Sequence, residues 1–226
     1  MDEKSWKNAW GGNILFSHGT NLSRGVAILI PDSIEPRLNI SNIHTDSEGR
    51  MVLLEGEIDD NPVVIINLYA PTKDQENLQL QFLKQVIECL EKYNDKNVII
   101  GGDFNICLNN NLDKRGGKKE NASKSSNFLN SLIEEYNLSD IWRIRNPTEQ
   151  KYTRRENCKT GLVQSRLDYI LISTQLSYNI SKCDIKPGLK SDHSLVNITL
   201  DLVNTEQRGP SYWKFNNTLL LDNTYT

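Results

Sequence analysis

Four short runs rich in Val and Ile, each next to a polar motif, constrain the fold of this chain more than any other feature. Such runs are typical of strands buried in a sheet. The runs cover residues 63–66, 97–100, 169–172 and 195–198, and the motifs are Asn67-Leu68-Tyr69-Ala70-Pro71, Gly101-Gly102-Asp103-Phe104-Asn105, Arg166-Leu167-Asp168-Tyr169 and Ser191-Asp192-His193-Ser194. Polar groups at strand ends can converge on one edge of a sheet. Carboxylates, an amide, a phenol and an imidazole together suit metal-assisted phosphodiester cleavage.

The elements between these motifs favour an α+β sandwich. Strands are predicted near residues 14–16 and 25–30, and a hairpin is predicted from 51–58 and 62–68. Helices are predicted over 75–93 and 124–136, because their apolar residues recur at helical spacing. Hairpin-like pairs interrupt the alternation of strands and helices, so we expect sheets packed face to face with helices outside, as a four-layered α/β/β/α sandwich.

Length and charge bound the function classes. The 226 residues suit one domain over 1–202 and a linker or tail over 203–226, where the sequence turns polar. The net charge of −3, from 26 basic and 29 acidic residues, argues against coating nucleic acid by bulk charge. Basic residues nevertheless gather in 143–160 and 114–119. These segments are either solvated loops or a local groove for nucleic acid.

Cysteine spacing and hydropathy indicate an intracellular protein. The four cysteines are far apart, no pair has metal-ligand spacing, and no secretory signal is present, so we expect free thiols. No apolar run approaches the ~18 residues that a membrane span needs, so no membrane partner is expected.

Asp103 and Asn105 are the first candidate pair for chemistry. They follow a predicted buried strand at positions i and i+2, which project from one face of an extended segment. A carboxylate and an amide there can hold and deprotonate a water, or complete the oxygen shell of a metal. The same residues could instead form an Asx-turn that ends the strand.

Three further positions could join that pair. In Asp192-His193, neighbouring side chains cannot face the same way, so we expect them to divide roles between a metal and a phosphate, unless the pair lies in a surface loop. Asp168 lies inside an otherwise apolar strand, residues 167–172, so we expect it to be buried and hydrogen-bonded to a partner, which His193 could be, unless the strand is at an edge. Tyr69 could donate to a phosphate oxygen or plug the core.

Taken together, the motifs resemble the endonuclease/exonuclease/phosphatase superfamily, which includes apurinic endonucleases and pancreatic-type deoxyribonucleases. The chain is most similar to the endonuclease domain of non-LTR retrotransposons. Residues 24–29 and the four motifs match in order and spacing. The tail segment 209–216, Gly-Pro-Ser-Tyr-Trp-Lys-Phe-Asn, resembles the stretch that joins that domain to a reverse transcriptase.

The resemblance implies a role for each site residue. Tyr69 would contact the scissile phosphate, Asp103 and Asn105 would orient or deprotonate the attacking water, and Asp168 would pair with His193, which stabilises the pentacovalent phosphate. Mg²⁺ or Mn²⁺ would be held by Asp192, Asp103 and Asn105. DNA would be contacted by Arg24, Arg115, Arg154 and Arg155, with Arg154 or Arg155 nearest a groove.

The resemblance also implies a DNA nick with a 3′-hydroxyl that primes reverse transcription, which places the activity in the nucleus. Element RNA and reverse transcriptase are expected partners only if the chain is part of a longer polyprotein. Family members begin with a strand–helix–strand unit carrying an Asn and a metal-binding Glu, which we do not recognise here. We therefore expect an N-terminally truncated domain, with doubtful activity on its own. Two alternatives stay open: another phosphoesterase of this superfamily, or a non-catalytic binding protein that keeps the fold.

Overall fold

The computed structural model describes residues 3–20, 24–117, 121–159, 161–188 and 190–201. The predicted tail 203–226 lies outside the described residues, so the domain boundary stays a prediction. No described helix is long and apolar enough to cross a membrane. The elements are α1 (Glu3–Trp10), β1 (Asn13–Ser17), β2 (Val26–Ile30), β3 (Leu38–Thr45), β4 (Met51–Ile58), β5 (Asn61–Tyr69), α2 (Glu76–Glu91), β6 (Asn97–Asp103), β7 (Lys114–Arg115), α3 (Lys124–Glu135), β8 (Leu138–Asp140), α4 (Ile141–Arg145), β9 (Arg154–Cys158), β10 (Gly161–Ser165), β11 (Asp168–Ser173), β12 (Ile180–Pro187) and β13 (Ser194–Leu200), with short 3-10 turns at Glu35–Arg37, Lys73–Gln75 and Thr174–Asn179.

A six-stranded mixed sheet forms the centre of the molecule. Its strand order is β3-β4-β5-β6-β11-β8, in which only the β5–β6 pair is parallel. The predicted hairpin is β4–β5, and it turns at Asp59 and Asp60, which both have positive φ. Two-residue turns of that kind match the right-handed twist of the strands they join.

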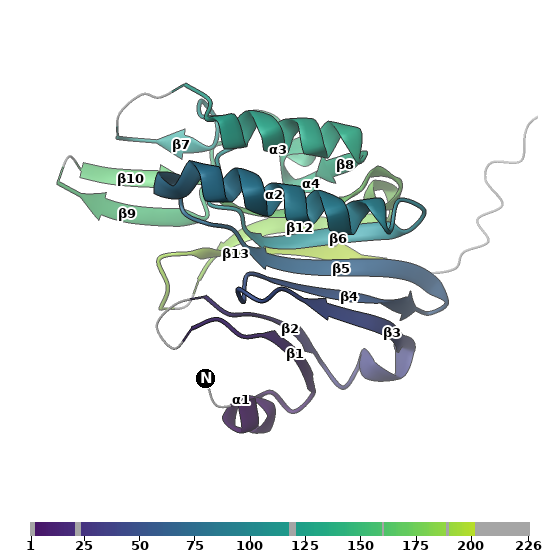
Figure 1. The fold of residues 1–226 in the computed structure, drawn as a ribbon. Helices are drawn as coiled ribbons and strands as arrows, with labels where there is room; N and C mark the ends of the chain where they lie inside the picture. Colours follow the sequence, from purple (N-terminus) through teal and green to yellow (C-terminus); the bar gives the residue numbers. More distant parts are fainter. Residues whose placement is uncertain (1–2, 21–23, 118–120, 160, 189, 202–226) are drawn as a thin grey trace, which may run out of the picture.

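Helices α2 and α3 cover one face of this sheet (Figure 1). Helix α2 buries Phe82, Leu83, Val86 and Leu90, which recur on one side of a 3.6-residue period. Helix α3 begins after Ser123, whose side chain accepts a hydrogen bond from the Ser126 N–H, as the orphan donors of a first turn require. Both predicted helices are thus present.

The opposite face is covered by two separate two-stranded sheets, β1–β2 and β12–β13. Each pair has its own apolar cluster against the central sheet. A trough of about 520 Å³ lies between them, with β2 on one bank and β13 on the other. Its floor includes Ile65, Ile99 and Ile170, which are only half-buried. The predicted α+β class is confirmed, and the second β-layer is divided into two pieces.

A third small sheet, β7-β10-β9, extends beyond the end of the central sheet where β5 and β6 finish (Figure 1). Strands β3, β7, β8, β10 and β12 and helices α1 and α4 were not predicted. Strand β3 is a largely exposed edge strand of mixed polar and apolar residues, so it lacks the Val/Ile run of a buried strand. Helix α1 has no buried residue that could have marked its inner face.

Candidate active site

The register of three neighbouring strands brings the first site residues together. Tyr69 of β5 is opposite Asp103 of β6 in the parallel pair. Asp103 is in turn opposite Asp168 of β11 in the antiparallel pair. The three predicted residues therefore lie side by side at one end of the sheet, although they are far apart in the sequence.

A tight turn after β6 presents Asp103. Gly102 has a φ of 136°, and a Cβ added there would lie 2.0 Å from the Leu68 carbonyl oxygen, so only glycine fits. The Asn105 N–H donates to Asp103 Oδ1 at 2.8 Å, which is the Asx-turn considered as the alternative. The Asn105 side chain donates to the Ala70 carbonyl at 2.9 Å. Asn105 thus holds the turn in shape, while the second carboxylate oxygen of Asp103 accepts none of these bonds.

The surroundings of Asp103 keep its carboxyl group poised near neutrality. Burial raises its pKa from 3.8 to about 6, and the neighbouring Asp168 carboxylate acts in the same direction. The N–H of Asn105, His193 and Arg154 oppose this rise only in part. A carboxylate with such a pKa can take up a proton at physiological pH, as a general base must.

The raised pKa predicts that Asp103 destabilises the fold when it ionises. Below pH 3.8 the carboxyl is protonated in both folded and unfolded chains, and its penalty appears as the pH rises through about 6. We expect Asp103→Asn to have a free energy of unfolding about 2 kcal/mol higher than the parent at pH 7, and therefore a higher urea midpoint. Near pH 3.5 the two proteins should have the same free energy of unfolding. Urea titrations without divalent metal test this, and an equal difference at both pH values would contradict it.

Asp168 and His193 form the predicted pair. His193 Nδ1 lies 2.9 Å from Asp168 Oδ2 and 3.2 Å from Oδ1. This hydrogen bond raises the pKa of His193 against the opposing effect of burial, so the imidazolium is favoured. The expected burial of Asp168 is only partial, because its side chain is 19 % exposed. Asp168 is the first residue of β11 and precedes the stretch that pairs with β8, so the sheet does not cover it there.

Only some of the residues predicted to bind metal or phosphate lie close together. Asp103, Asp168 and His193 bring ligand atoms within 4.8 Å of one another. The Asp192 carboxylate is outside this group, with its side chain 64 % exposed and 3.7 Å from Arg154 Nε. Tyr69 is half-buried, and the Arg50 guanidinium lies 5.6 Å from the centre of the Tyr69 ring. Tyr69 also lines a hollow of about 990 Å³, together with Asp103.

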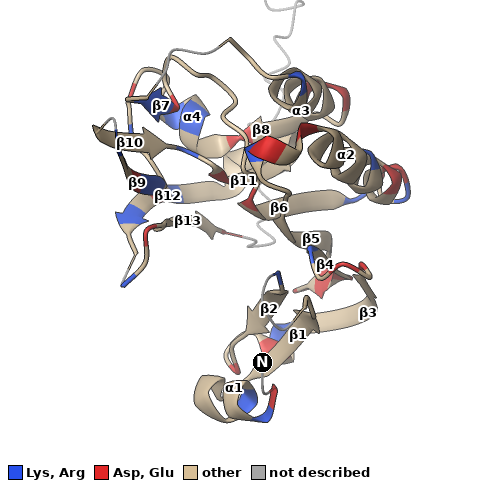
Figure 2. Ribbon diagram, turned by 60° about the vertical axis from the view of Figure 1, so that its left-hand side comes forward, with Lys and Arg blue, Asp and Glu red and all other residues tan. Residues whose placement is uncertain are grey.

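Most of the predicted DNA-contacting arginines lie on the small sheet beside the site. Arg154 and Arg155 are on β9 and Arg115 is on β7, both paired with β10. Figure 2 shows these strands and α4 carrying basic residues on the same side of the molecule. Arg154 also forms a β-bridge with His193, so this sheet is joined directly to the site. Arg24 is not on this sheet: it lies between β1 and β2, pairs with Glu48, and lines the same hollow as Tyr69 and Asp103.

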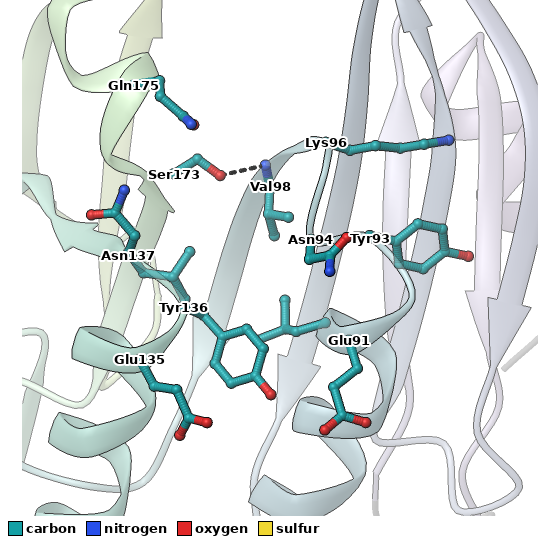
Figure 3. A pocket seen from close by; sticks show the side chains of 12 residues that line it. Glu91, Tyr93, Asn94, Lys96, Val98, Glu135, Tyr136, Asn137, Ser173 and Gln175 are labelled. Atoms are coloured by element: carbon teal, nitrogen blue, oxygen red, sulfur yellow. Dashed lines mark hydrogen bonds between the residues drawn. The ribbon is translucent and has the colours of Figure 1, made fainter.

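A second hollow lies at the other end of the central sheet, between the C-terminal ends of α2 and α3 (Figure 3). Its volume is about 450 Å³, and Tyr93, Tyr136 and Ser173 are among its lining residues. None of the predicted site residues borders it. The Ser173 hydroxyl accepts the Val98 N–H at 2.8 Å there, which ties β11 to β6 far from Asp103.

Sequence reasoning missed three buried polar groups that support the site. The Gln79 amide donates to the carbonyls of Pro71 and Asn105. Arg166 and Asp113 form a buried ion pair directly before Asp168. Thr153 accepts the N–H groups of Leu167 and Asp168. Arg166 was quoted as part of a motif without a role. The others lie in no motif, and their partners are too distant in sequence for any local pattern to reveal them.

The comparisons with known proteins agree with this geometry. A model of the endonuclease/exonuclease/phosphatase family matches residues 2–193. The chain belongs to this family. Its similarity to the "Transposon TX1 uncharacterized 149 kDa protein" of Xenopus laevis is 32 % identity over 97 % of the chain, but only 16 % of that protein. DNA-(apurinic or apyrimidinic site) endonuclease 2 of Saccharomyces cerevisiae is 26 % identical over 85 % of the chain and 46 % of the enzyme. The chain therefore spans less than half of either relative.

Solved members of the family share its fold. An AP endonuclease from Archaeoglobus fulgidus superposes with a TM-score of 0.68 at 22 % identity, over 89 % of this chain and 84 % of that one. The endonuclease domain of TRAS1, a telomere-specific non-LTR retrotransposon, gives a TM-score of 0.62 at 14 % identity, over 85 % and 81 %. At these identities the likeness establishes the fold alone, and the family's chemistry must be argued from the residues present.

Proposed function

We propose that this chain is a metal-dependent phosphodiesterase domain that nicks DNA, of the type found in non-LTR retrotransposons. The observation that carries the proposal is the position of Asp103, whose pKa is raised to about 6, beside the hydrogen-bonded Asp168–His193 pair. One group is suited to accept a proton and the other to carry a positive charge, which hydrolysis of a phosphodiester requires together. The similarity to DNA-(apurinic or apyrimidinic site) endonuclease 2 supports DNA as the substrate, and the similarity to the TX1 transposon protein supports the retrotransposon type.

The residues have different tasks in the proposed reaction. Asp103 takes the proton of the attacking water, while Asn105 holds the turn that presents Asp103. The His193 imidazolium, oriented by Asp168 through Nδ1, donates from its other ring nitrogen to a phosphate oxygen as negative charge develops. The Tyr69 phenol, at the same level of the sheet, contacts a second phosphate oxygen.

The donor set at this sheet end fits a hard divalent cation. Asp103 offers a carboxylate oxygen free of the Asn105 hydrogen bond, and Mg²⁺ is commonly held by one or two carboxylates together with water and phosphate. Asp103 and Asn105 are the proposed ligands, with Asp192 as an outlying third. When bound, Mg²⁺ or Mn²⁺ would stabilise negative charge on the phosphate.

Attack of the water breaks the bond between phosphorus and the 3′ oxygen, and the leaving oxygen takes a proton from solvent. The product is proposed to be a nick with a 5′-phosphate and a 3′-hydroxyl able to prime reverse transcription. Element RNA and a reverse transcriptase would be partners if the chain is part of a longer polyprotein, as the length of the TX1 protein suggests. Activity of this kind would be exerted on nuclear DNA. Incubating the chain with supercoiled plasmid and Mg²⁺ tests the proposal, with EDTA as control. Open circles that a DNA polymerase extends without further treatment are expected, and intact supercoils at micromolar protein would contradict the proposal.

The small sheet β7-β10-β9 is proposed to follow the DNA backbone. We expect Arg154→Gln with Arg155→Gln to weaken duplex binding and to reduce the slope of log K against log salt by about 1–2, because two phosphate contacts are lost. Filter binding between 50 and 200 mM salt measures this slope. The matched control, Lys84→Gln with Lys92→Gln on and just after α2, makes the same charge change away from the site. If both pairs change the slope equally, the DNA path lies elsewhere.

A further inference from the structure

Thr153 is a fully buried residue at the junction of three segments, and the reaction proposed above gives it no task. Its hydroxyl accepts the backbone N–H groups of Leu167 at 2.9 Å and Asp168 at 3.1 Å. Its own N–H donates to the Ser165 carbonyl at 3.0 Å, and its carbonyl accepts the Ser194 N–H at 2.6 Å. Every one of these bonds is to a backbone group, so Thr153 fixes the backbone positions of the segments around it.

The bonds of Thr153 connect two strands that do not pair with each other. Asp168 begins β11, which belongs to the central sheet, whereas His193 directly precedes β13, which pairs with β12 in a different sheet. The hydroxyl of Thr153 holds the N–H of Asp168 itself. Its carbonyl holds the residue that follows His193. Thr153 is therefore hydrogen-bonded to both segments whose positions set the distance between the carboxylate and the imidazole.

The neighbours of Thr153 make the same connection. The Arg155 N–H donates to the Asp192 carbonyl at 3.1 Å, and Arg154 forms a β-bridge with His193. The start of β9 is thus hydrogen-bonded along the whole Asp192–Ser194 segment. Thr153 is the point at which this connection also reaches β11, through a side chain.

We propose that Thr153 is a positioning residue that sets the relative placement of Asp168 and His193, and thereby the rate of the chemical step; this inference rests on the function proposed above. A hydroxyl oxygen has two lone pairs, and here it accepts two N–H groups. Valine has the same shape but no acceptor, so it would leave two buried donors unpaired. The β-branched side chain also restricts χ1, which fixes the oxygen in place.

Substitutions that separate shape from hydrogen bonding test the proposal. We expect Thr153→Val to lower kcat for plasmid nicking roughly 10–100-fold with KM near the parental value, since small misplacements of reacting groups have effects of that size. Thr153→Ser keeps the oxygen and should stay within about threefold of the parent in kcat. A residue that merely supported stability would give no such split between kcat and KM.

Two NMR measurements that do not depend on nuclease activity separate this inference from the proposed function. The ¹⁵N shift of His193 Nδ1 reports its hydrogen bond to Asp168, and amide exchange reports the protection of Leu167 and Asp168. In Thr153→Val both should change at fixed pH, and in Thr153→Ser both should remain near the parent. If the parent chain does not nick DNA, these spectra still decide the role of Thr153.

Ser173→Ala is the matched control, because Ser173 is another buried hydroxyl that accepts a backbone N–H, at the far end of the same sheet (Figure 3). It should leave the His193 signal and kcat unchanged. If Thr153→Val does not fold, Thr153→Cys replaces the oxygen with a weak acceptor of similar size and takes its place. A parental His193 shift and parental kcat in the folded variant would overturn the proposal, as would an equal loss in Ser173→Ala.

Discussion

Replacing His193 with alanine is expected to reduce DNA nicking by roughly 10²–10⁴-fold, the usual effect of removing a positioned acid, base or charge stabiliser. His193 is hydrogen-bonded to Asp168, which lies opposite Asp103 in the sheet, whereas His18 pairs with Glu3 and His44 lies exposed on edge strand β3. The hydrogen bond to Asp168 raises the pKa of His193, which favours the positively charged ring. The variant therefore loses both the proton donor and the charge facing the phosphate.

Initial rates of supercoil relaxation in Mg²⁺ measure this effect. His44→Ala is the control, since it removes an imidazole from the same sheet without reaching the site.

Asp103→Asn should lose activity to a similar extent, because its carboxylate is the proposed base. It should also gain stability at pH 7, because ionising the buried carboxyl group destabilises the fold. If either site variant keeps half of the parental rate, the assignment of roles is wrong.

The second large effect is expected for stability, at Arg166. Its side chain is 1 % exposed and lies 2.7 Å from both Asp113 and Asp140, and Arg143 contacts the same Asp113 oxygen, Oδ1, at 2.7 Å. The ring of Tyr169 covers it at 4.5 Å. Removing Arg166 leaves buried carboxylates without their main partner. We expect Arg166→Ala to lower the free energy of unfolding by about 3–5 kcal/mol, a large share of the ~5–15 kcal/mol typical of a domain.

Urea denaturation followed by tryptophan fluorescence measures the loss. Arg37→Ala provides the comparison, because Arg37 pairs with Asp59 on the surface, where both side chains are well exposed, and little change is expected there. Arg166 also lies close to the proposed site residues in the chain, so its loss should affect them as well. Its backbone carbonyl accepts the Tyr169 hydroxyl, and it precedes Asp168 by two residues. A midpoint shift no larger than that of Arg37→Ala would contradict a structural role for this ion network.

Local sequence was enough to predict that Tyr69, Asp103, Asp168 and His193 come together at one end of the sheet. The runs before Tyr69 and Asp103 are buried parallel strands, and the ends of adjacent parallel strands lie at the same edge, so their convergence follows from strand type alone. The Asp168–His193 bond was predictable because a carboxylate beside an apolar strand needs a partner. The helical stripes of α2 and α3 were equally clear, since their period of 3.6 residues is visible within a single window.

The tertiary structure alone decided how these groups are held. Arg166 meets Asp113 across 53 positions, and Thr153 meets Leu167 and Asp168 across 14 and 15, through bonds that no local pattern records. The division of the second β-layer, the exposed position of Asp192 and the partial exposure of Asp168 also depend on where distant strands stop pairing. Sequence thus determined the chemistry available at one sheet end, because hydrophobic periodicity is local. The distances that make this chemistry usable came from buried polar contacts, which only the folded chain brings together.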